Sequence, residues 1–412
     1  MEEKRQLKSG FTTGTCAAAA AMAAAQALAG GGKREYVSLM TPGGREAAFE
    51  VLWQPECVKE AGDGQGGFWP GSESPEKQIC MVRKDSGDDP DVTNGTLIGA
   101  AVSFGENVQR AEESGEELPG IYSDHSQSPS VYLTGGIGVG RVTKKGLKCP
   151  VGYPAINPVP RQMIAEAART ALWKLGCERP VYIEIFIPAG RKLALKTFNP
   201  RLGIVGGISV LGTSGIVEPM SEQALIDTIR VEMRQKLANG MEYLLVVPGN
   251  YGIDFLDQYG HGLQLEDAVK CSNFVGEALD AAVEFGAKGV LLVGHIGKFV
   301  KLAGGIMNTH SHNADARMEL LTVHAALLGA PVELLQKMME CVTTDDALKY
   351  LKEADLMEPV MERIMEKVEF YVNQRAQHQL ELGVITFSNV FGILGQTKNV
   401  PDLVKKIGRD KT

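Results

Sequence analysis

The hydrophobic pattern of this 412-residue chain changes near residue 203. Beyond that point, short apolar runs typical of buried strands alternate with longer stretches typical of helices. The predicted strands are Tyr243–Val247, Gly289–Val293 and Gly383–Phe387. The predicted helices cover Ser221–Leu237, Leu265–Phe285, Arg317–Leu328, Pro331–Glu340, Asp345–Ala354 and Pro359–Leu382. Because strands that alternate with helices favour βαβ units, residues 203–412 are predicted to form an α/β domain with a mainly parallel sheet.

The N-terminal half mixes helical and strand-like stretches. An alanine-rich helix is expected between Thr12-Thr13-Gly14-Thr15 and Gly30-Gly31-Gly32, since threonine caps helix starts and glycine caps helix ends. The expected strands are Tyr36–Met40, Ala47–Trp53, Gln78–Arg83, Ser130–Leu133, Gly138–Thr143 and Val181–Ile187. Two polar stretches, 62–76 and 111–130, lack periodicity and are interpreted as exposed insertions. Residues 1–202 are therefore predicted to form a mixed α+β domain, and the chain length favours two domains.

Polar side chains follow the predicted strand Gly289–Val293 directly. The segment Gly294-His295-Ile296-Gly297-Lys298 should lie at the carboxyl edge of the sheet, where open α/β folds bind ligands. The charge of a histidine can switch near neutral pH, which makes His295 a candidate site residue. The Gly-Lys pair suggests a phosphate-binding P-loop, but the first glycine of that motif is missing and Phe299 replaces its Ser/Thr.

Three further polar segments, all in the first half of the chain, are candidates for ligand binding. The threonines before the alanine-rich helix could bind an anion or only cap the helix. The segment Lys84–Gly95 carries four aspartates in seven positions, but Thr96 stands where an EF-hand needs glutamate, which favours turns stabilised by aspartate side chains. The proline-braced loop before Arg161 either holds Asn157 and Arg161 for carboxylate binding or is a rigid interdomain loop with a surface arginine.

The segment that joins the two halves is rich in glycine and polar residues. It includes Asn199, Arg201, Thr213 and Gly215, and we expect a cleft between the domains to form there. No GxGxxG motif follows a strand in this segment, which argues against a standard dinucleotide site.

Composition excludes several functional classes. The net charge of −8 and the lack of a basic stripe disfavour nucleic-acid binding, so an anionic ligand would require locally concentrated positive charge. Ala17–Ala29 is too short to span a membrane, and the N-terminus lacks the apolar region of a secretion signal. Seven scattered cysteines without a CxxC motif fit reduced cytoplasmic thiols, and His310-Ser311-His312 lacks a third metal ligand. We therefore expect a cytoplasmic protein without a membrane partner or a protein-bound metal.

A series of motifs follows in chain order through nearly the whole chain, except for the two polar insertions. These motifs are SGFTTGTCAAAAA, KDSGDDPDVTNG, GIGVGRVTKKGL, PVGYPAINPVPRQMI, FNPRLGIVGGISVLGTSGIVEPMS, PGNYG, CSNFVG, GHIGKFVKLAGGIMNTHSHNADAR and ITFSNVFGILG. Taken together, they resemble the cobalt-precorrin-5B C(1)-methyltransferase family of anaerobic cobalamin biosynthesis.

The resemblance implies methyl transfer from S-adenosyl-L-methionine to C-1 of a cobalt-bound tetrapyrrole, giving cobalt-precorrin-6A. Residues 1–202 would face the tetrapyrrole and residues 203–412 would hold S-adenosylmethionine, while the substrate itself carries the cobalt. His295 is the favoured base if a proton must leave, followed by Asp89. The expected cofactor-binding residues are Gly249, Asn250, Gly252, Gly294, Gly297, Thr213 and Gly215. The expected substrate-binding residues are Thr12, Thr13, Thr15, Asn157, Arg161, Asn199, Arg201, Lys298, Lys301, Asn308, Thr309 and His310.

Two alternatives remain open at this point. One is a non-catalytic tetrapyrrole-binding protein of the same pathway, which would bind the macrocycle without consuming S-adenosylmethionine. The other is a phosphoryl-transfer enzyme, against which the incomplete P-loop argues. A homo-oligomer is compatible with the sequence, which fixes no oligomeric state.

Overall fold

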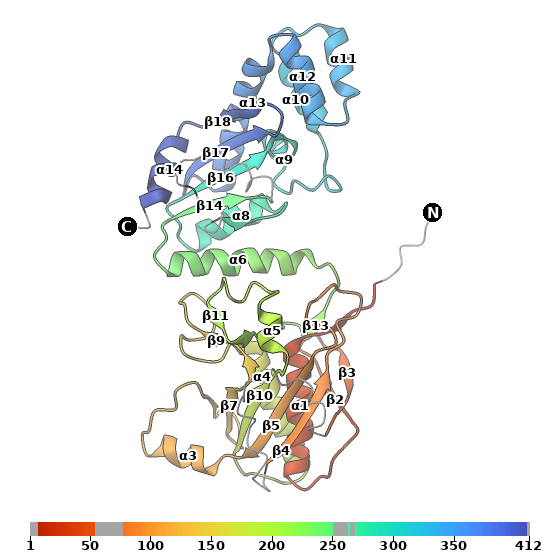
Figure 1. Ribbon diagram of the computed structural model, residues 1–412, viewed down its shortest axis with the longest axis vertical. Helices are drawn as coiled ribbons and strands as arrows, with labels where there is room; N and C mark the ends of the chain where they lie inside the picture. The colour runs from red at the N-terminus through yellow and green to blue at the C-terminus, as the bar shows by residue number, and fades with distance from the viewer. Residues whose placement is uncertain (1–6, 54–76, 250–262, 264–267, 410–412) are drawn as a thin grey trace. The chain divides into compact units, whose positions relative to one another are not determined.

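The computed structural model describes residues 7–53, 77–249, 263 and 268–409. Contacts within the chain divide it into two compact units, Met1–Ser221 and Glu222–Thr412, which are described separately (Figure 1). Among the described residues, none of the helices combines the length and the apolar character needed to cross a lipid bilayer. Of the two predicted insertions, residues 62–76 lie outside the described residues.

The first unit is built on a mixed five-stranded sheet in the order β4-β5-β10-β7-β6. Its strands are β4 (Gln78–Arg83), β5 (Leu97–Phe104), β6 (Tyr122–Asp124), β7 (Val131–Gly135) and β10 (Val181–Phe186). β10 pairs parallel with β7, and the other neighbours are antiparallel. The predicted mixed α+β character of this part is confirmed.

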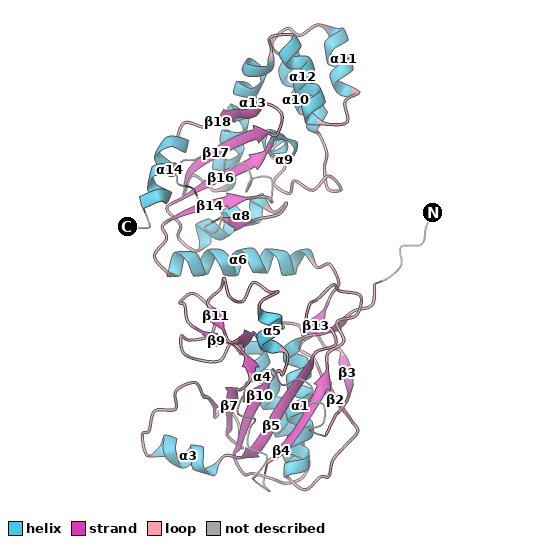
Figure 2. Ribbon diagram, viewed as in Figure 1, coloured by secondary structure: helices cyan, strands magenta, loops and turns pink. Residues whose placement is uncertain are grey.

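Two helices cover one face of this sheet, α1 (Thr13–Leu28) and α4 (Pro158–Trp173) (Figures 1 and 2). The predicted alanine-rich helix is thus confirmed, and its alanines from Ala17 to Ala25 are buried against α4 and the strands. The alanine side chain ends at Cβ, so the two helices can approach closely. The side chain of Thr12 caps α1 by accepting the Thr15 N–H.

Short elements complete the first unit. Two five-residue strands, β2 (Tyr36–Met40) and β3 (Glu46–Glu50), pair with each other. Three further pairs consist of two-residue strands: β1 (Gly10–Phe11) with β13 (Ile216–Val217), β8 (Gly138–Val139) with β12 (Gly207–Ile208), and β9 (Arg141–Val142) with β11 (Ile204–Val205). Its short helices are α3 (Glu106–Glu113) and α5 (Gly190–Ala194).

The interpretation of residues 111–130 as an exposed insertion is only partly right: most of its residues are exposed, but the stretch also carries secondary structure. This stretch contains the end of α3 and the strand β6, which pairs with β7 in the main sheet. Arg169 of α4 is 1% exposed, and it anchors the stretch by donating to the carbonyl oxygens of Pro129 and Asp124. Residues 111–130 therefore belong to the framework of the first unit.

The second unit contains a five-stranded sheet in the order β15-β14-β16-β17-β18. Its strands are β14 (Tyr243–Val247), β15 (Val269–Lys270), β16 (Gly289–His295), β17 (Glu381–Ser388) and β18 (Gly392–Gln396). All neighbours are parallel except β17 and β18, which confirms the predicted mainly parallel sheet. When these five strands are numbered by their order along the chain, their order across the sheet is 2-1-3-4-5. This is a doubly wound order, with a switch point between the first and third strands.

Helices lie on both faces of this sheet. α14 (Val400–Arg409) packs on the face that carries Leu245, Leu291 and Ile385. The opposite face is covered by α6 (Glu222–Ala238), α8 (Val275–Glu284) and α13 (Met357–Arg375). Burial on both faces explains why β14 and β16 are almost continuously apolar.

The remaining helices of the second unit are short. α9 (Ile296–Phe299) and the 3-10 turn η2 (Val300–Gly304) follow β16 directly. Three further helices precede α13: α10 (Arg317–Ala326), α11 (Val332–Met339) and α12 (Thr344–Glu353). Two predicted helices were too long. The helix predicted over Leu265–Phe285 begins at Val275, after β15. The helix predicted over Pro359–Leu382 is α13, which ends at Arg375, shortly before Gln377 and His378 take positive φ angles.

Candidate functional site

The carboxyl ends of four parallel strands meet at one edge of the second unit's sheet. β14 and β16 flank the switch point, so Pro248 and Gly249 follow one strand where His295 ends the other. The helices on the two faces diverge at such a point, which makes it the usual ligand site of doubly wound sheets. The topology therefore brings Gly249 to the same edge as the predicted Gly294–Lys298 segment.

His295 caps the short helix α9. Its Nδ1 accepts the Gly297 N–H at 3.1 Å, and its ring meets the Phe387 ring edge-on at a centroid distance of 5.6 Å. Burial lowers the pKa of His295, and the charge of Asp345 only partly opposes this effect. Neutral imidazole carries one proton, so an Nδ1 that accepts a hydrogen bond leaves that proton on Nε2. In this arrangement the ring of His295 is a hydrogen-bond donor at Nε2.

Two predicted substrate lysines follow within the next six residues. Lys301 is 2% exposed and its Nζ donates to the carbonyl oxygens of Thr309 at 3.1 Å and Ala314 at 2.8 Å. Lys298 is half-buried and donates to the Ser272 carbonyl oxygen at 3.5 Å. Within the described ranges, Lys298 has no carboxylate partner at salt-bridge distance. Lys301 thus holds the following loop in place, whereas Lys298 is the better candidate to bind an anion.

Burial lowers the pKa values of both lysines. For Lys298 the neighbouring Cys271 opposes the effect and Lys301 adds to it, while Asp315 opposes it for Lys301. A half-buried ammonium without a carboxylate partner gains most from a bound anion, because burial has already weakened its hydration.

The loop after η2 carries the other predicted substrate residues. The Thr309 N–H donates to the Asn273 carbonyl oxygen at 2.9 Å, which ties this loop to the turn after β15. Asn308 accepts the His310 N–H through its side chain at 3.1 Å. His310 is exposed, and its Nδ1 accepts the His312 N–H at 3.1 Å. Asn308 and Thr309 therefore lie near the carboxyl edge, with their side chains partly engaged in loop structure.

The glycines of the predicted cofactor site differ in what a Cβ atom would contact at each position. A Cβ on Gly294 would lie 2.4 Å from a ring atom of Phe299, so this glycine makes room for a protein side chain. A Cβ on Gly297 would lie 3.3 Å from Nδ1 of His295, and one on Gly249 would meet none of the described residues within 4 Å. Gly249 and Gly297 remain candidates for close approach of a ligand. Asn250 and Gly252 lie outside the described residues.

The substitution Gly294→Ala is expected to destabilise the protein by about 1–3 kcal/mol, since the added methyl group overpacks a buried strand against Phe299. Gly297→Ala is the matched control and is expected to cost less than about 1 kcal/mol. Urea denaturation of both variants measures the difference. Equal stability of the two variants would show that Phe299 yields easily and that Gly294 serves another purpose.

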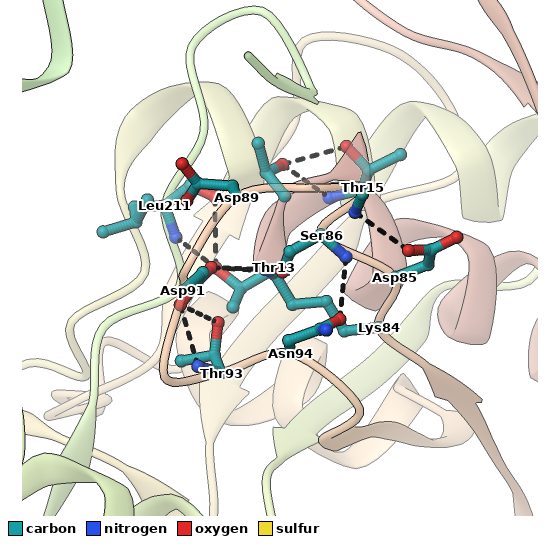
Figure 3. Close-up of polar contacts among 12 residues, drawn as sticks. Thr13, Thr15, Lys84, Asp85, Ser86, Asp89, Asp91, Thr93, Asn94 and Leu211 are labelled. Atoms are coloured by element: carbon teal, nitrogen blue, oxygen red, sulfur yellow. Dashed lines mark hydrogen bonds and ion pairs between the residues drawn. The ribbon is translucent and has the colours of Figure 1, made fainter. Parts of the chain in front are cut away.

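The predicted threonine cluster joins the start of α1 to a distant loop. Thr13 Oγ1 donates to the Leu211 carbonyl oxygen at 3.1 Å and accepts the Leu211 N–H at 2.9 Å (Figure 3). Thr15 Oγ1 donates to the Gly215 carbonyl oxygen at 2.6 Å. The N–H groups of Gly14 and Thr15 also have partners within the protein. The backbone N–H groups of Thr12, Gly14 and Thr15 are therefore already used, which favours the capping interpretation; a substrate contact by Thr12, Thr13 or Thr15 stays a prediction.

The aspartate-rich loop beside α1 forms a network around a buried lysine. Lys84 Nζ lies 2.5 Å from Asp91 Oδ2 and also donates to the Ser86 hydroxyl (Figure 3). Asp91 Oδ1 accepts the Thr93 N–H, and Asp85 Oδ1 accepts the Gly87 N–H, each two residues ahead. The predicted turns stabilised by aspartate side chains are thus confirmed for Asp85 and Asp91.

The remaining predicted residues of the first unit lie in several places. Asp89 is half-buried and accepts the Met220 N–H at 3.1 Å, which ties the aspartate-rich loop to the end of the unit. Asn199 is 8% exposed and accepts the Ser209 hydroxyl at 3.2 Å. Arg201 and Thr213 are exposed, and Gly215 is buried with φ of +79°. Asn157 directly precedes α4, and Arg161 is the fourth residue of that helix.

Comparison with known proteins decides the family. The family model described as CbiD matches residues 1–219, and the model of the CbiD C-terminal domain matches residues 308–398. The chain belongs to the CbiD family. A relative from Ruminiclostridium cellulolyticum, named cobalt-precorrin-5B C(1)-methyltransferase, is 41% identical, with 98% of this chain and 97% of the relative covered.

A second relative of this CbiD-family chain carries the same name. A protein of the same name from Alkaliphilus metalliredigens is 38% identical over 98% of this chain and 96% of its own length. A crystal structure of a cobalamin biosynthesis protein from Archaeoglobus fulgidus matches at 25% identity with a TM-score of 0.36, covering 76% of this chain and 84% of that one.

Sequence reasoning missed two residues at this edge of the sheet. Asn273 follows β15 and holds Thr309. Asp345 accepts the Ser388 hydroxyl at 2.7 Å, beside the end of β17, and its charge acts on His295. Asn273 could have been found from the motif CSNFVG, because polar residues there follow an apolar position. Asp345 gave no such signal, since it reads as an ordinary helix-start residue.

Proposed function

We propose that this protein methylates C-1 of cobalt-precorrin-5B with S-adenosyl-L-methionine and forms cobalt-precorrin-6A. The observation that carries the proposal is the 41% identity over nearly the full length with a cobalt-precorrin-5B C(1)-methyltransferase. The switch-point edge of the second unit supports it, since this is where a doubly wound sheet holds a small molecule. The cobalt belongs to the substrate, and the protein acts in the cytoplasm.

S-adenosylmethionine binds along the carboxyl edge of the second unit. Gly249 and Gly297 allow it to approach the backbone, and Lys298 pairs with a carboxylate. The sulfonium methyl group is already electrophilic, so the protein mainly aligns it with the macrocycle carbon at roughly 3–3.5 Å and excludes water. Residues of the first unit bind the tetrapyrrole, whose many carboxylates require cations in a protein of net charge −8.

A direct assay tests this function. Purified protein is incubated with cobalt-precorrin-5B and methyl-labelled S-adenosylmethionine, and mass spectrometry follows transfer of the label to the tetrapyrrole together with formation of S-adenosylhomocysteine. We expect label transfer that depends on both substrates. Tight tetrapyrrole binding without label transfer would contradict the proposal and support a non-catalytic binding protein.

A further inference from the structure

The first unit contains a small cavity lined in part by Arg161, one of the predicted substrate-binding residues. It has a volume of about 210 Å³ and lies between the sheet strands β6 and β7 and the first turns of α4. Its apolar walls include Val131, Leu133 and Ala165, and its polar groups include Arg161 and Gln162. Sites for whole drug-sized molecules usually occupy about 300–1,000 Å³, so this cavity suits one side arm of a larger ligand.

Arg161 is the uncompensated charge of this cavity. Its guanidinium stacks over the Tyr122 ring at 4.1 Å, and its Nε is buried without a hydrogen-bond partner. Across the described ranges, no carboxylate forms an ion pair with Arg161. A buried donor without a partner costs free energy unless a ligand or water accepts its hydrogen bond. The guanidinium therefore has an open requirement for an acceptor.

The nearby carboxylate of Asp124 does not meet this requirement, because Arg169 already holds it. Arg169 Nη2 lies 3.1 Å from Asp124 Oδ1. Burial alone would raise the pKa of Asp124, but hydrogen bonds from Arg169 and Ser126 and the charge of Arg169 outweigh it and lower the pKa to about 2. Asp124 is thus ionised and paired, and its pairing leaves Arg161 as the free cation of the cavity.

The surroundings fix the Arg161 fork in place. The Tyr122 hydroxyl donates to the Pro154 carbonyl oxygen at 2.8 Å, and the Tyr153 ring lies against Tyr122 at a centroid distance of 5.1 Å. The stacked ring holds the planar guanidinium in one orientation. A planar guanidinium presents two parallel N–H donors, a geometry that matches the two oxygens of a carboxylate.

We propose that this cavity binds a peripheral carboxylate arm of the tetrapyrrole, an acetate or propionate group, with Arg161 pairing the carboxylate and Val131, Leu133 and Ala165 contacting its methylene carbons. This inference rests on the proposed function for the identity of the ligand. It deepens that function by assigning a specificity-determining contact for the macrocycle to the first unit.

The substitution Arg161→Gln tests the proposal. We expect the KM for cobalt-precorrin-5B to rise about 10- to 100-fold, the loss typical of a hydrogen-bonded ionic contact. The kcat should stay within about threefold and the KM for S-adenosylmethionine should not change, because the residue contacts only the tetrapyrrole arm. Arg161→Lys keeps the charge without the fork and should give an intermediate KM.

Arg179→Gln is the matched control. Arg179 also stacks on an aromatic ring, that of Phe104, but it is paired with Glu106 at 2.6 Å, so its replacement should leave both KM values unchanged. Circular dichroism and thermal unfolding verify that each variant is folded. A second measurement independent of turnover is the Kd for cobalt-precorrin-5B in the presence of S-adenosylhomocysteine, which should rise in parallel with KM.

The outcomes separate this inference from the proposed function. If the wild-type protein turns over and folded Arg161→Gln keeps the wild-type KM and Kd, the carboxylate site is refuted and the methyltransferase stands. If the wild-type protein binds the tetrapyrrole without turnover and Arg161→Gln weakens that binding, the carboxylate site stands and the methyltransferase is refuted.

Discussion

Replacing Lys84 with methionine is expected to lower the free energy of unfolding by about 3 kcal/mol, because it removes one partner of a buried ion pair. The Lys84 side chain is 1% exposed, and its Nζ contacts both Asp91 and the Ser86 hydroxyl. Methionine has nearly the same length but no charge, so the packing is kept and the electrostatic partner is lost. Urea denaturation monitored by circular dichroism measures the change.

Substitution of the other partner of this ion pair, Asp91, should lower the free energy of unfolding by more. Asp91→Asn leaves the ammonium of Lys84 unpaired, and Lys84 is more deeply buried than Asp91, whose side chain is 24% exposed. We expect a loss of about 3–5 kcal/mol for Asp91→Asn and a double variant that loses less than the sum of the two single losses. Lys8→Ala is the matched control, since Lys8 forms an exposed pair with Asp85 of the same loop and such pairs contribute little. Additive single losses would show that Lys84 and Asp91 do not stabilise each other.

The pH dependence of stability gives an independent check. Burial would raise the pKa of Asp91, but the hydrogen bond and charge of Lys84, together with the Thr93 donors, outweigh burial and lower it. The stabilisation is therefore complete above the ordinary pKa of aspartate and is lost as the pH falls through the lowered folded-state pKa. This acid-dependent loss should be smaller in Lys84→Met than in the wild-type protein.

The fold of the second unit was largely predictable from its hydrophobic pattern. β14 and β16 are buried on both faces, so each is an apolar run that stands out from its neighbours. The end of α13 was not predictable, because the residues after Arg375 contain no glycine or proline until Gly383. The left-handed conformations that end the helix fall on Gln377 and His378, which carry no such signal. The two-residue strand β15 is too short to have a pattern of its own.

The first unit shows the opposite case, in which composition misled in part. Residues 111–130 have the glutamate, serine and proline content of a solvent-exposed loop. Their order comes from partners distant in sequence, chiefly Arg169 on α4 and the pairing of β6 with β7. Such non-local contacts leave no periodic trace within the segment itself. For this reason Arg161 was recognised as a candidate from the sequence, while Tyr122, the residue that orients it, was not.

The candidate site also has features that the sequence could predict and features that it could not. A buried strand followed by polar residues predicted the carboxyl edge at His295 and Lys298, because that placement follows from strand direction alone. The partners of the threonine cluster could not be predicted, since Thr15 bonds to Gly215 across 200 positions of sequence. The choice between anion binding and capping at Thr12–Thr15 therefore depended on the structure.

Replacing His295 with alanine is expected to reduce turnover about 100-fold, well beyond the effect of the lost helix cap on folding. His295→Asn is expected to retain turnover within about tenfold of the wild-type protein. Asparagine can accept the Gly297 N–H through Oδ1 and donate through Nδ2, which reproduces the two hydrogen-bonding functions of the neutral ring. Steady-state kinetics with saturating S-adenosylmethionine compares the three proteins.

The asparagine variant also decides between two roles for His295. A general base must accept a proton, and an asparagine amide does not do so at neutral pH; inactivity of folded His295→Asn would therefore establish the base role and contradict the donor role. Because burial lowers the pKa of His295, the cap is intact above the ordinary histidine pKa of 6.5, and its stabilisation declines as the pH falls below that value, where the unfolded chain takes up the proton first. Asparagine does not titrate in this range. The acid-induced loss of stability attributable to His295 should thus disappear in His295→Asn, while wild-type-like acid sensitivity of this variant would place the titrating group elsewhere.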